Sequence, residues 1–184
     1  MGSPPDLMSG YMSTIFDRLG FRCGMDIEYS TGGKEELDLV GPLWRRLRAH
    51  HAAVSPEFSE QLLSVSFESR KRDLLKKSDG GHLRIDFARA RKTGELAGYC
   101  VSSVTGDGQG EIDSIFVKEE CRGCGVGDSL MKSALTWMDG FQVKGKMLQV
   151  IVGNERVHRF YARFGFRTRT IIMEQTENAK RGFS

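Results

Sequence analysis

The sequence is poor in the features that mark disulfide-rich, membrane-spanning or strongly basic proteins. Its 184 residues include 4 cysteines, too few and too unevenly placed for a disulfide framework. No apolar run approaches the roughly 20 residues that span a bilayer, and the N-terminus lacks the basic start and apolar centre of a secretory signal. The net charge of +3 is too small to indicate a nucleic-acid partner. We therefore expect a cytoplasmic protein with one folded domain and no membrane or nucleic-acid partner.

The most informative segment that is present is glycine-rich and reads Arg-Gly-Cys-Gly-Val-Gly at residues 122–127. It lies between a strand-like segment at 111–117 and a helix-like segment at 128–138. Alternate glycines allow a tight turn that exposes backbone N–H groups at the start of a helix, where the partial positive charge favours a phosphate. The segment therefore predicts a cradle for a pyrophosphate.

The spacing of these glycines argues against two other phosphate-binding loops. A dinucleotide-binding fingerprint needs its third glycine where Asp128 stands, and it normally follows the first strand of a fold. A P-loop needs a lysine and a hydroxyl residue, and neither follows Gly127 in the required register. A Rossmann nucleotide site and P-loop ATP chemistry are therefore disfavoured.

Periodicity and turn residues predict alternating helices and strands along the rest of the chain. An apolar stripe with helical spacing at residues 8–19 predicts an N-terminal helix. The later elements are expected in the order strand, two helices, three strands, helix, strand, helix and strand, at residues 25–29, 35–51, 58–77, 82–89, 96–104, 111–117, 128–138, 147–152, 155–164 and 167–175. We expect Gly41-Pro42 to start, kink or interrupt the first of these helices, and the apolar strand 147–152 to be buried on both faces.

Two motifs resemble the GNAT superfamily of acyl-CoA N-acyltransferases. Arg-x-x-Gly-x-Gly follows a strand that ends in Ile-Phe-Val, and a second match has Asn154, then Tyr161, then Gly165-Phe166. The resemblance covers roughly residues 25–175 and implies an α/β fold whose mixed, mostly antiparallel sheet is flanked by helices on both sides. Residues 1–24 then form a helical extension that packs on the domain or on the other subunit of a homodimer, and residues 25–184 form the GNAT acetyltransferase domain.

The resemblance implies that acetyl-CoA is the donor substrate and that no metal takes part. In the family, the pantetheine arm pairs with the backbone of the fourth strand. The implied acyl-CoA contacts come from this strand, the Gly-rich loop, the helical turn that follows it and one asparagine: Ile115, Phe116, Val117, Arg122, Gly123, Cys124, Gly125, Val126, Gly127, Asp128 and Asn154. The strand residues also suit core packing, and capping alone would explain Asn154.

Acetyl transfer to an amine needs a group that accepts the proton of the amine. A lysine-like amine has a pKa near 10.4, so its neutral form costs about 4 to 5 kcal/mol at pH 7. Glu111, six residues before Val117, matches the base of the histone-acetylating branch of the superfamily. An exposed carboxylate at a strand end would look the same, and Glu95 and Asp113 are alternative bases.

The departing CoA thiolate needs a hydrogen-bond or proton donor. Tyr161 matches the acid of the family, although a core residue beside Phe160 and Phe164 would give the same pattern. The resemblance therefore implies an acetyl-CoA-dependent N-acetyltransferase in which an amine attacks the thioester directly, without a covalent cysteine intermediate. The alternative is a noncatalytic acyl-CoA-binding or regulatory module.

Three further groups of residues carry weaker signals. Cys121-x-x-Cys124 could be half of a zinc or redox site, but a second pair of ligands is missing. His50-His51 suits the surface or an acceptor contact, and the basic residues 70–72 and 76–77 suit a solvated helical face. The acceptor stays open among small-molecule and peptide amines: a small amine, an amino acid, an antibiotic, a peptide N-terminus or a lysine side chain.

Overall fold

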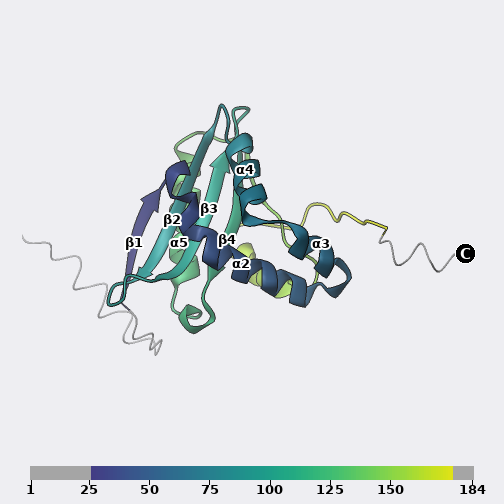
Figure 1. Cartoon of the computed structure of the whole chain (residues 1–184). Coiled ribbons are helices and arrows are strands. Elements are labelled where there is room, and N and C mark those ends of the chain that lie inside the picture. The colour runs from purple at the N-terminus through teal and green to yellow at the C-terminus, as the bar shows by residue number, and fades with distance from the viewer. Residues whose placement is uncertain (1–25, 176–184) are drawn as a thin grey trace, which may run out of the picture.

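A five-stranded sheet forms the centre of the protein (Figure 1). The computed structural model describes residues 26–175, so the predicted helix at residues 8–19 and the extension at 1–24 lie outside the described part. The strands are β1 (Ile27–Gly32), β2 (His82–Ala90), β3 (Leu96–Val104), β4 (Gln109–Val117) and β5 (Gly145–Leu148), and they are neighbours in that order. The first four are antiparallel, and β5 runs parallel to β4. The prediction of a mixed, mostly antiparallel sheet is confirmed.

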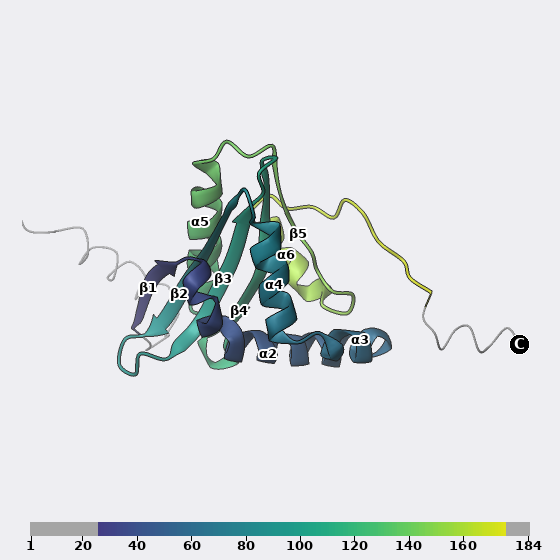
Figure 2. The same ribbon diagram turned by 45° about the horizontal axis from the view of Figure 1, so that its top comes forward.

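Helices cover both faces of this sheet (Figures 1 and 2). They are α2 (Leu37–Val54), α3 (Ser59–Ser64), α4 (Phe67–Lys77), α5 (Val126–Asp139) and α6 (His158–Ala162), with short 3-10 turns at Lys34–Glu36, Pro56–Phe58, Glu119–Cys121 and Glu155–Val157. Helices α2 and α4 lie on one face, and α5 lies on the other. The sheet therefore has a hydrophobic core on each side.

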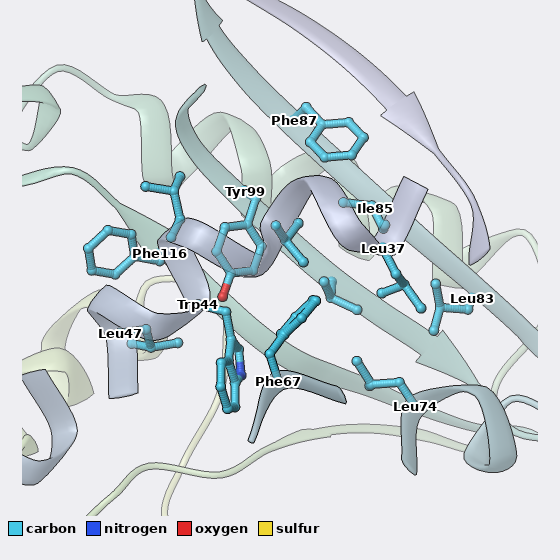
Figure 3. Packing of buried hydrophobic residues seen from close by; sticks show 13 residues of the cluster. Leu37, Trp44, Leu47, Phe67, Leu74, Leu83, Ile85, Phe87, Tyr99 and Phe116 are labelled. Carbon is cyan, nitrogen blue, oxygen red and sulfur yellow. The ribbon is translucent and has the colours of Figure 1, made fainter. Parts of the chain in front are cut away.

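Alternating side chains of the strands divide between these two cores, because successive residues of a strand point to opposite faces. On the first face, Ile85 and Tyr99 pack with Trp44 of α2 and Phe67 of α4 (Figure 3). On the second face, Cys100 packs against α5. Each fully buried large apolar side chain contributes about 1.5 to 3 kcal/mol to stability, so the two cores fix the positions of the helices relative to the sheet.

Of the three effects expected from Gly41-Pro42, neither a helix start nor an interruption occurs, because α2 runs from Leu37 to Val54 with Pro42 inside it. Proline in a helix removes one hydrogen bond and crowds the preceding turn. Here the helix is held by packing on both sides of that position, because Leu37 and Trp44 are almost completely buried in the first core. Gly41 leaves the space that the ring of Phe67 occupies, since a Cβ atom there would lie 3.2 Å from the ring.

The predicted helix at 58–77 is divided into α3 and α4. Ser66 adopts an extended backbone between them, and its hydroxyl accepts a hydrogen bond from the backbone N–H of Ser69 at 3.1 Å. This N-cap starts a new helix at Phe67, so that its ring can enter the first core. A serine cap was the sequence signal for this break.

Two predictions about the last strands were wrong. The strand predicted at 147–152 is β5, which ends at Leu148 and is only partly buried, with Met147 39% exposed. It lies at the edge of the described sheet, so it has one neighbouring strand. The strand predicted at 167–175 does not form, and this segment leads away from the sheet (Figure 2). Its alternation lacks a partner strand within residues 26–175, and Ile171 and Met173 remain exposed.

Candidate functional site

A cavity of about 1160 Å³ opens where β4 and β5 separate. The two strands pair only from Gln109 to Ile112 of β4. At the next residue, Asp113, β4 has a bulge, because Ser102 pairs with Ile112 while Val101 pairs with Ser114. Within the described residues, positions 113–117 of β4 therefore have a strand neighbour on one side only. The open side provides backbone groups that an extended ligand can pair with.

The Gly-rich loop forms one end of this cavity. Gly123 and Gly125 have φ values of 77° and 76°, a left-handed conformation that favours glycine. Among residues 26–175, no atom lies within 4 Å of where a Cβ atom would stand on either glycine, so this part of the chain leaves the space beside both residues open. Gly125 is the N-cap of α5, whose first N–H groups have no acceptor within the helix. The turn and helix start that the sequence predicted are present.

Two arginines, Arg122 and Arg163, contribute to the cavity lining near this loop. The Arg163 guanidinium donates two hydrogen bonds to the carboxylate of Asp128, at 3.0 and 2.6 Å. Arg122 donates to the carbonyl oxygen of Val117 at 3.1 Å. Positive charge and free N–H groups therefore meet at the start of α5, an arrangement that suits a phosphate group.

The predicted strand contacts Ile115, Phe116 and Val117 all line the cavity. The ring of Phe116 belongs to the first core, so its side chain has a packing role and its backbone is the part that a ligand can reach. The remaining predicted contacts, Arg122 to Asp128 and Asn154, also line the cavity. The structure thus brings together residues from β4, the loop, α5 and the segment before α6.

Glu111 is not among the residues that line the cavity. Its carboxylate lies 2.6 Å from the ammonium of Lys77 on α4. Lys77 is also 2.6 Å from Asp113, which does line the cavity. One lysine therefore joins the predicted base to a carboxylate at the cavity wall. The third carboxylate, Glu95, also lies outside the lining, and it pairs with Lys118 at 3.2 Å.

Asp113 has a completely buried side chain with three partners. Besides Lys77, Ser103 donates a hydrogen bond to it at 2.6 Å, and the guanidinium of Arg70 lies 3.6 Å away. A buried carboxylate needs such compensation, and losing one partner of a buried ion pair costs about 3 to 5 kcal/mol. The expectation that residues 70–72 and 76–77 form a solvated face is therefore wrong for Arg70 and Lys77, which hold α4 against β4.

Tyr161 on α6 lines the cavity and packs against Phe160 and Phe166. Burial raises the pKa of Tyr161 to about 12, so its hydroxyl stays protonated at neutral pH and can donate a hydrogen bond. Asn154 is buried and lines the same cavity, but its side chain does not cap the helix. Its Oδ1 atom has no hydrogen-bond partner among the described residues. A buried amide oxygen without a partner suits a ligand that donates a hydrogen bond.

The sequence reasoning named His50-His51 as an acceptor-contact candidate, and both residues line the cavity, but it missed the other side chains in the wall that α2 and α4 form. Trp44, Arg48 and His51 from α2 and Arg70 from α4 line it. Burial, His50 and Arg48 lower the pKa of His51 to about 4, so this imidazole is uncharged at neutral pH. The positions of Trp44, Arg48 and His51, at spacings of four and three residues, place them on one side of α2 and were the available signal.

Within residues 26–175, no cluster of three or more His, Cys, Asp or Glu side chains is arranged to hold a metal ion. None of the helices in that range has both the length and the apolar character needed to cross a membrane.

Comparisons with known proteins agree with this architecture. The sequence model of the Acetyltransferase (GNAT) family matches residues 46–166. An uncharacterized N-acetyltransferase of Methanocaldococcus jannaschii is 34% identical over 97 residues, which are 51% of this chain and 60% of that relative. The chain thus matches less than two thirds of the relative's length.

Solved structures share the fold at low sequence identity. A variant of the BH1408 protein of Bacillus halodurans has a TM-score of 0.62 at 17% identity, covering 80% of this chain and 98% of that one. An aminoglycoside N-acetyltransferase in complex with CoA has a TM-score of 0.56 at 18% identity, covering 85% of this chain and 98% of the other.

Proposed function

This chain belongs to the GNAT acetyltransferase family, and we propose that it transfers an acetyl group from acetyl-CoA to a primary amine by direct attack of the amine on the thioester. The observation that carries this proposal is a single cavity that contains the Gly-rich helix start, the open side of β4 and Tyr161. These are the parts needed to bind a long acyl-CoA molecule and to protonate its thiolate.

In this proposal, the pyrophosphate of CoA binds at the start of α5, with Arg122 nearby. The pantetheine arm runs between β4 and the chain after β5, where it pairs with backbone groups of residues 115–117 on the side of β4 that faces away from β3. Asn154 accepts a hydrogen bond from an amide N–H of the arm, because its buried Oδ1 has no partner among the described residues. These contacts supply orientation as well as affinity.

The amine attacks the carbonyl carbon of the thioester as a neutral nucleophile. A tetrahedral intermediate forms and then collapses, breaking the carbon–sulfur bond. Tyr161 donates a hydrogen bond or its proton to the sulfur that leaves, and Glu111 is the proposed acceptor of the amine proton. Because Glu111 lies outside the cavity lining, the proton reaches it through water or through Asp113, which shares Lys77 with it.

Binding and turnover can be tested separately. Wild-type protein is titrated with CoA and acetyl-CoA while its melting temperature is measured, and the release of CoA is then followed with a broad panel of amines. We expect both ligands to raise the melting temperature, and at least one amine to accelerate CoA release. A protein that binds acetyl-CoA but acetylates no amine would instead support the noncatalytic module.

The base is tested with Glu111→Gln. Glu95→Gln serves as the matched control, because Glu95 also lies outside the cavity lining and pairs with a lysine, but its partner is Lys118 and not the Lys77 that Glu111 shares with Asp113. The Glu111 variant should turn over slowly at neutral pH and partly recover at high pH, where free amine is abundant. If both variants match the wild type across that pH range, Glu111 is structural and Asp113 or a water chain becomes the leading base.

A further inference from the structure

The wall of the cavity formed by α2 and α4 carries a positive charge without a local counter-ion. Among the described residues, Arg48 makes no ion pair. One of its terminal nitrogens donates to the carbonyl oxygen of Leu62, which fixes the side chain between α2 and α3. Its Nε is buried and has no hydrogen-bond partner in residues 26–175. A buried guanidinium N–H without an acceptor is costly, so this position suits a ligand that brings one.

The described side chains next to Arg48 supply no negative charge that would compensate its guanidinium. Arg70 also lines the wall, and burial together with the charge of Arg70 lowers the pKa of Arg48. The Arg48 guanidinium nevertheless stays protonated at neutral pH. Arg70 itself already has Asp113, and the imidazole of His51 brings no negative charge. Asp73 lines the cavity too, but it is exposed and lies beyond 4.0 Å of either arginine.

The location of Arg48 separates it from the donor half of the cavity. The helix start that suits the pyrophosphate belongs to α5, on the opposite face of the sheet from α2. The N–H groups at that helix start, together with the exposed Arg122 of the Gly-rich loop, are placed to meet the phosphates there. Arg48 therefore has no task in binding the CoA phosphates, and it is available to the second substrate.

Resting on the proposed N-acetyltransferase function, we propose that Arg48 binds an anionic group of the acceptor, so that the preferred substrate is an amine that also carries a carboxylate or a phosphate. An arginine fork matches both groups, because each presents two oxygens to parallel N–H donors. Here the Nε of Arg48 is one available donor, and the indole of Trp44 lies against the same guanidinium, whose central carbon is 5.4 Å from the ring centre.

The test uses pairs of amines that differ only in the anionic group. One arm compares amino acids with the amines formed by their decarboxylation, and a second compares phosphoethanolamine with ethanolamine. We expect kcat/KM to be on the order of tenfold higher or more for the anionic member of at least one arm, which also identifies the group. Equal rates within every pair, or faster rates for the members without the anion, would overturn the proposal.

The variant Arg48→Gln removes the charge and keeps a neutral amide donor in the side chain. Arg45→Gln is the matched control, since Arg45 lies on the same helix, is 61% exposed and does not line the cavity. Arg48→Gln should raise KM for the anionic amine on the order of tenfold, and leave both the KM of the analogue that lacks the anionic group and the affinity for acetyl-CoA unchanged. A loss shared equally by both amines would overturn the proposal, as would a similar loss in Arg45→Gln.

A binding measurement covers the case in which no amine is acetylated and the proposed function itself fails. In a Trp137→Phe background, Trp44 is the remaining tryptophan of the 2 in the chain. Titration with the anionic amines should change Trp44 emission in a saturable way, and Arg48→Gln should abolish this change. If no anionic amine alters the emission, or if the variant responds like its parent, Arg48 does not bind an anion.

Discussion

Arg163 and Asp128 connect the two halves of the proposed donor site through paired hydrogen bonds of 3.0 and 2.6 Å. Asp128 lies in the first turn of α5, next to the Gly-rich loop. Arg163 directly follows α6, two residues after Tyr161, and its guanidinium also lies over the rings of Phe160 and Phe164. The contact therefore holds the proposed acid in place relative to the helix that starts at the phosphate cradle.

A double-mutant cycle measures this connection. Both side chains are partly exposed, so we expect Asp128→Asn and Arg163→Gln to show a coupling free energy of about 0.5 to 1 kcal/mol in denaturant unfolding. The bidentate geometry supports the upper part of that range. Strictly additive effects would mean that the pair contributes nothing to stability.

The phosphate cradle is tested with Gly125→Val. Valine at φ 76° is strained by about 1 to 2 kcal/mol, so the variant should melt below the wild type. Gly94→Val is the matched control, because Gly94 has a φ of 71°, has no atom of the described residues within 4 Å of its Cβ position, and lies in the turn between β2 and β3. Both variants should be destabilised, but only Gly125→Val should lose the rise in melting temperature that CoA causes. If Gly125→Val bound CoA with normal affinity, the Gly-rich loop would not be the binding site of the pyrophosphate.

Tyr161→Phe removes only the hydroxyl group of the proposed acid. We expect kcat to fall on the order of 100-fold, the lower end of what positioned proton transfer contributes, with little change in acetyl-CoA affinity. Tyr29→Phe is the control, because Tyr29 lies half exposed on β1 and does not line the cavity. Unchanged turnover under chemistry-limited conditions would leave Tyr161 as a core residue.

The low pKa of His51 leads us to expect that the free energy of unfolding falls in acid. Its pKa is about 4 in the folded protein, below the 6.5 of an unperturbed histidine, so the unfolded chain takes up the proton first as the pH falls. The contribution of His51 to stability is complete above pH 6.5 and is lost between pH 6.5 and 4. The free energy of unfolding of the wild type should therefore fall toward that of His51→Gln as the pH is lowered from 6.5 to 4. His158→Gln, at an exposed position, should keep the wild-type pH dependence.

Local sequence signals were sufficient to predict the parts of the site whose conformation depends on residues adjacent in the sequence. The Gly-rich loop was predicted from glycine spacing, because a tight turn and a helix start need only adjacent residues. The strands around Tyr99 and Phe116 were found for the same reason, since alternation along one strand shows which positions can face a core. GNAT membership followed from two such local motifs.

Long-range pairing was the part that the sequence did not reveal. The end of β5 at Leu148 and the missing strand at 167–175 depend on whether a partner strand is available, which alternation does not show. Likewise, the position of Glu111 depends on Lys77, a residue on a helix 34 positions earlier that looked like part of a solvated face. The uncompensated charge of Arg48 also became visible only after α2 and α4 were placed against β4.

The most direct test of acetyl transfer is a single-turnover experiment with radiolabelled acetyl-CoA and an amine acceptor. The wild-type protein is mixed with labelled donor and acceptor, the reaction is quenched at successive times, and the label is located. We expect label to move from CoA to the nitrogen of the amine as free CoA appears, and no labelled protein to accumulate. Label that stays on CoA although acetyl-CoA is bound, or that first collects on the protein, would contradict direct transfer in this cavity.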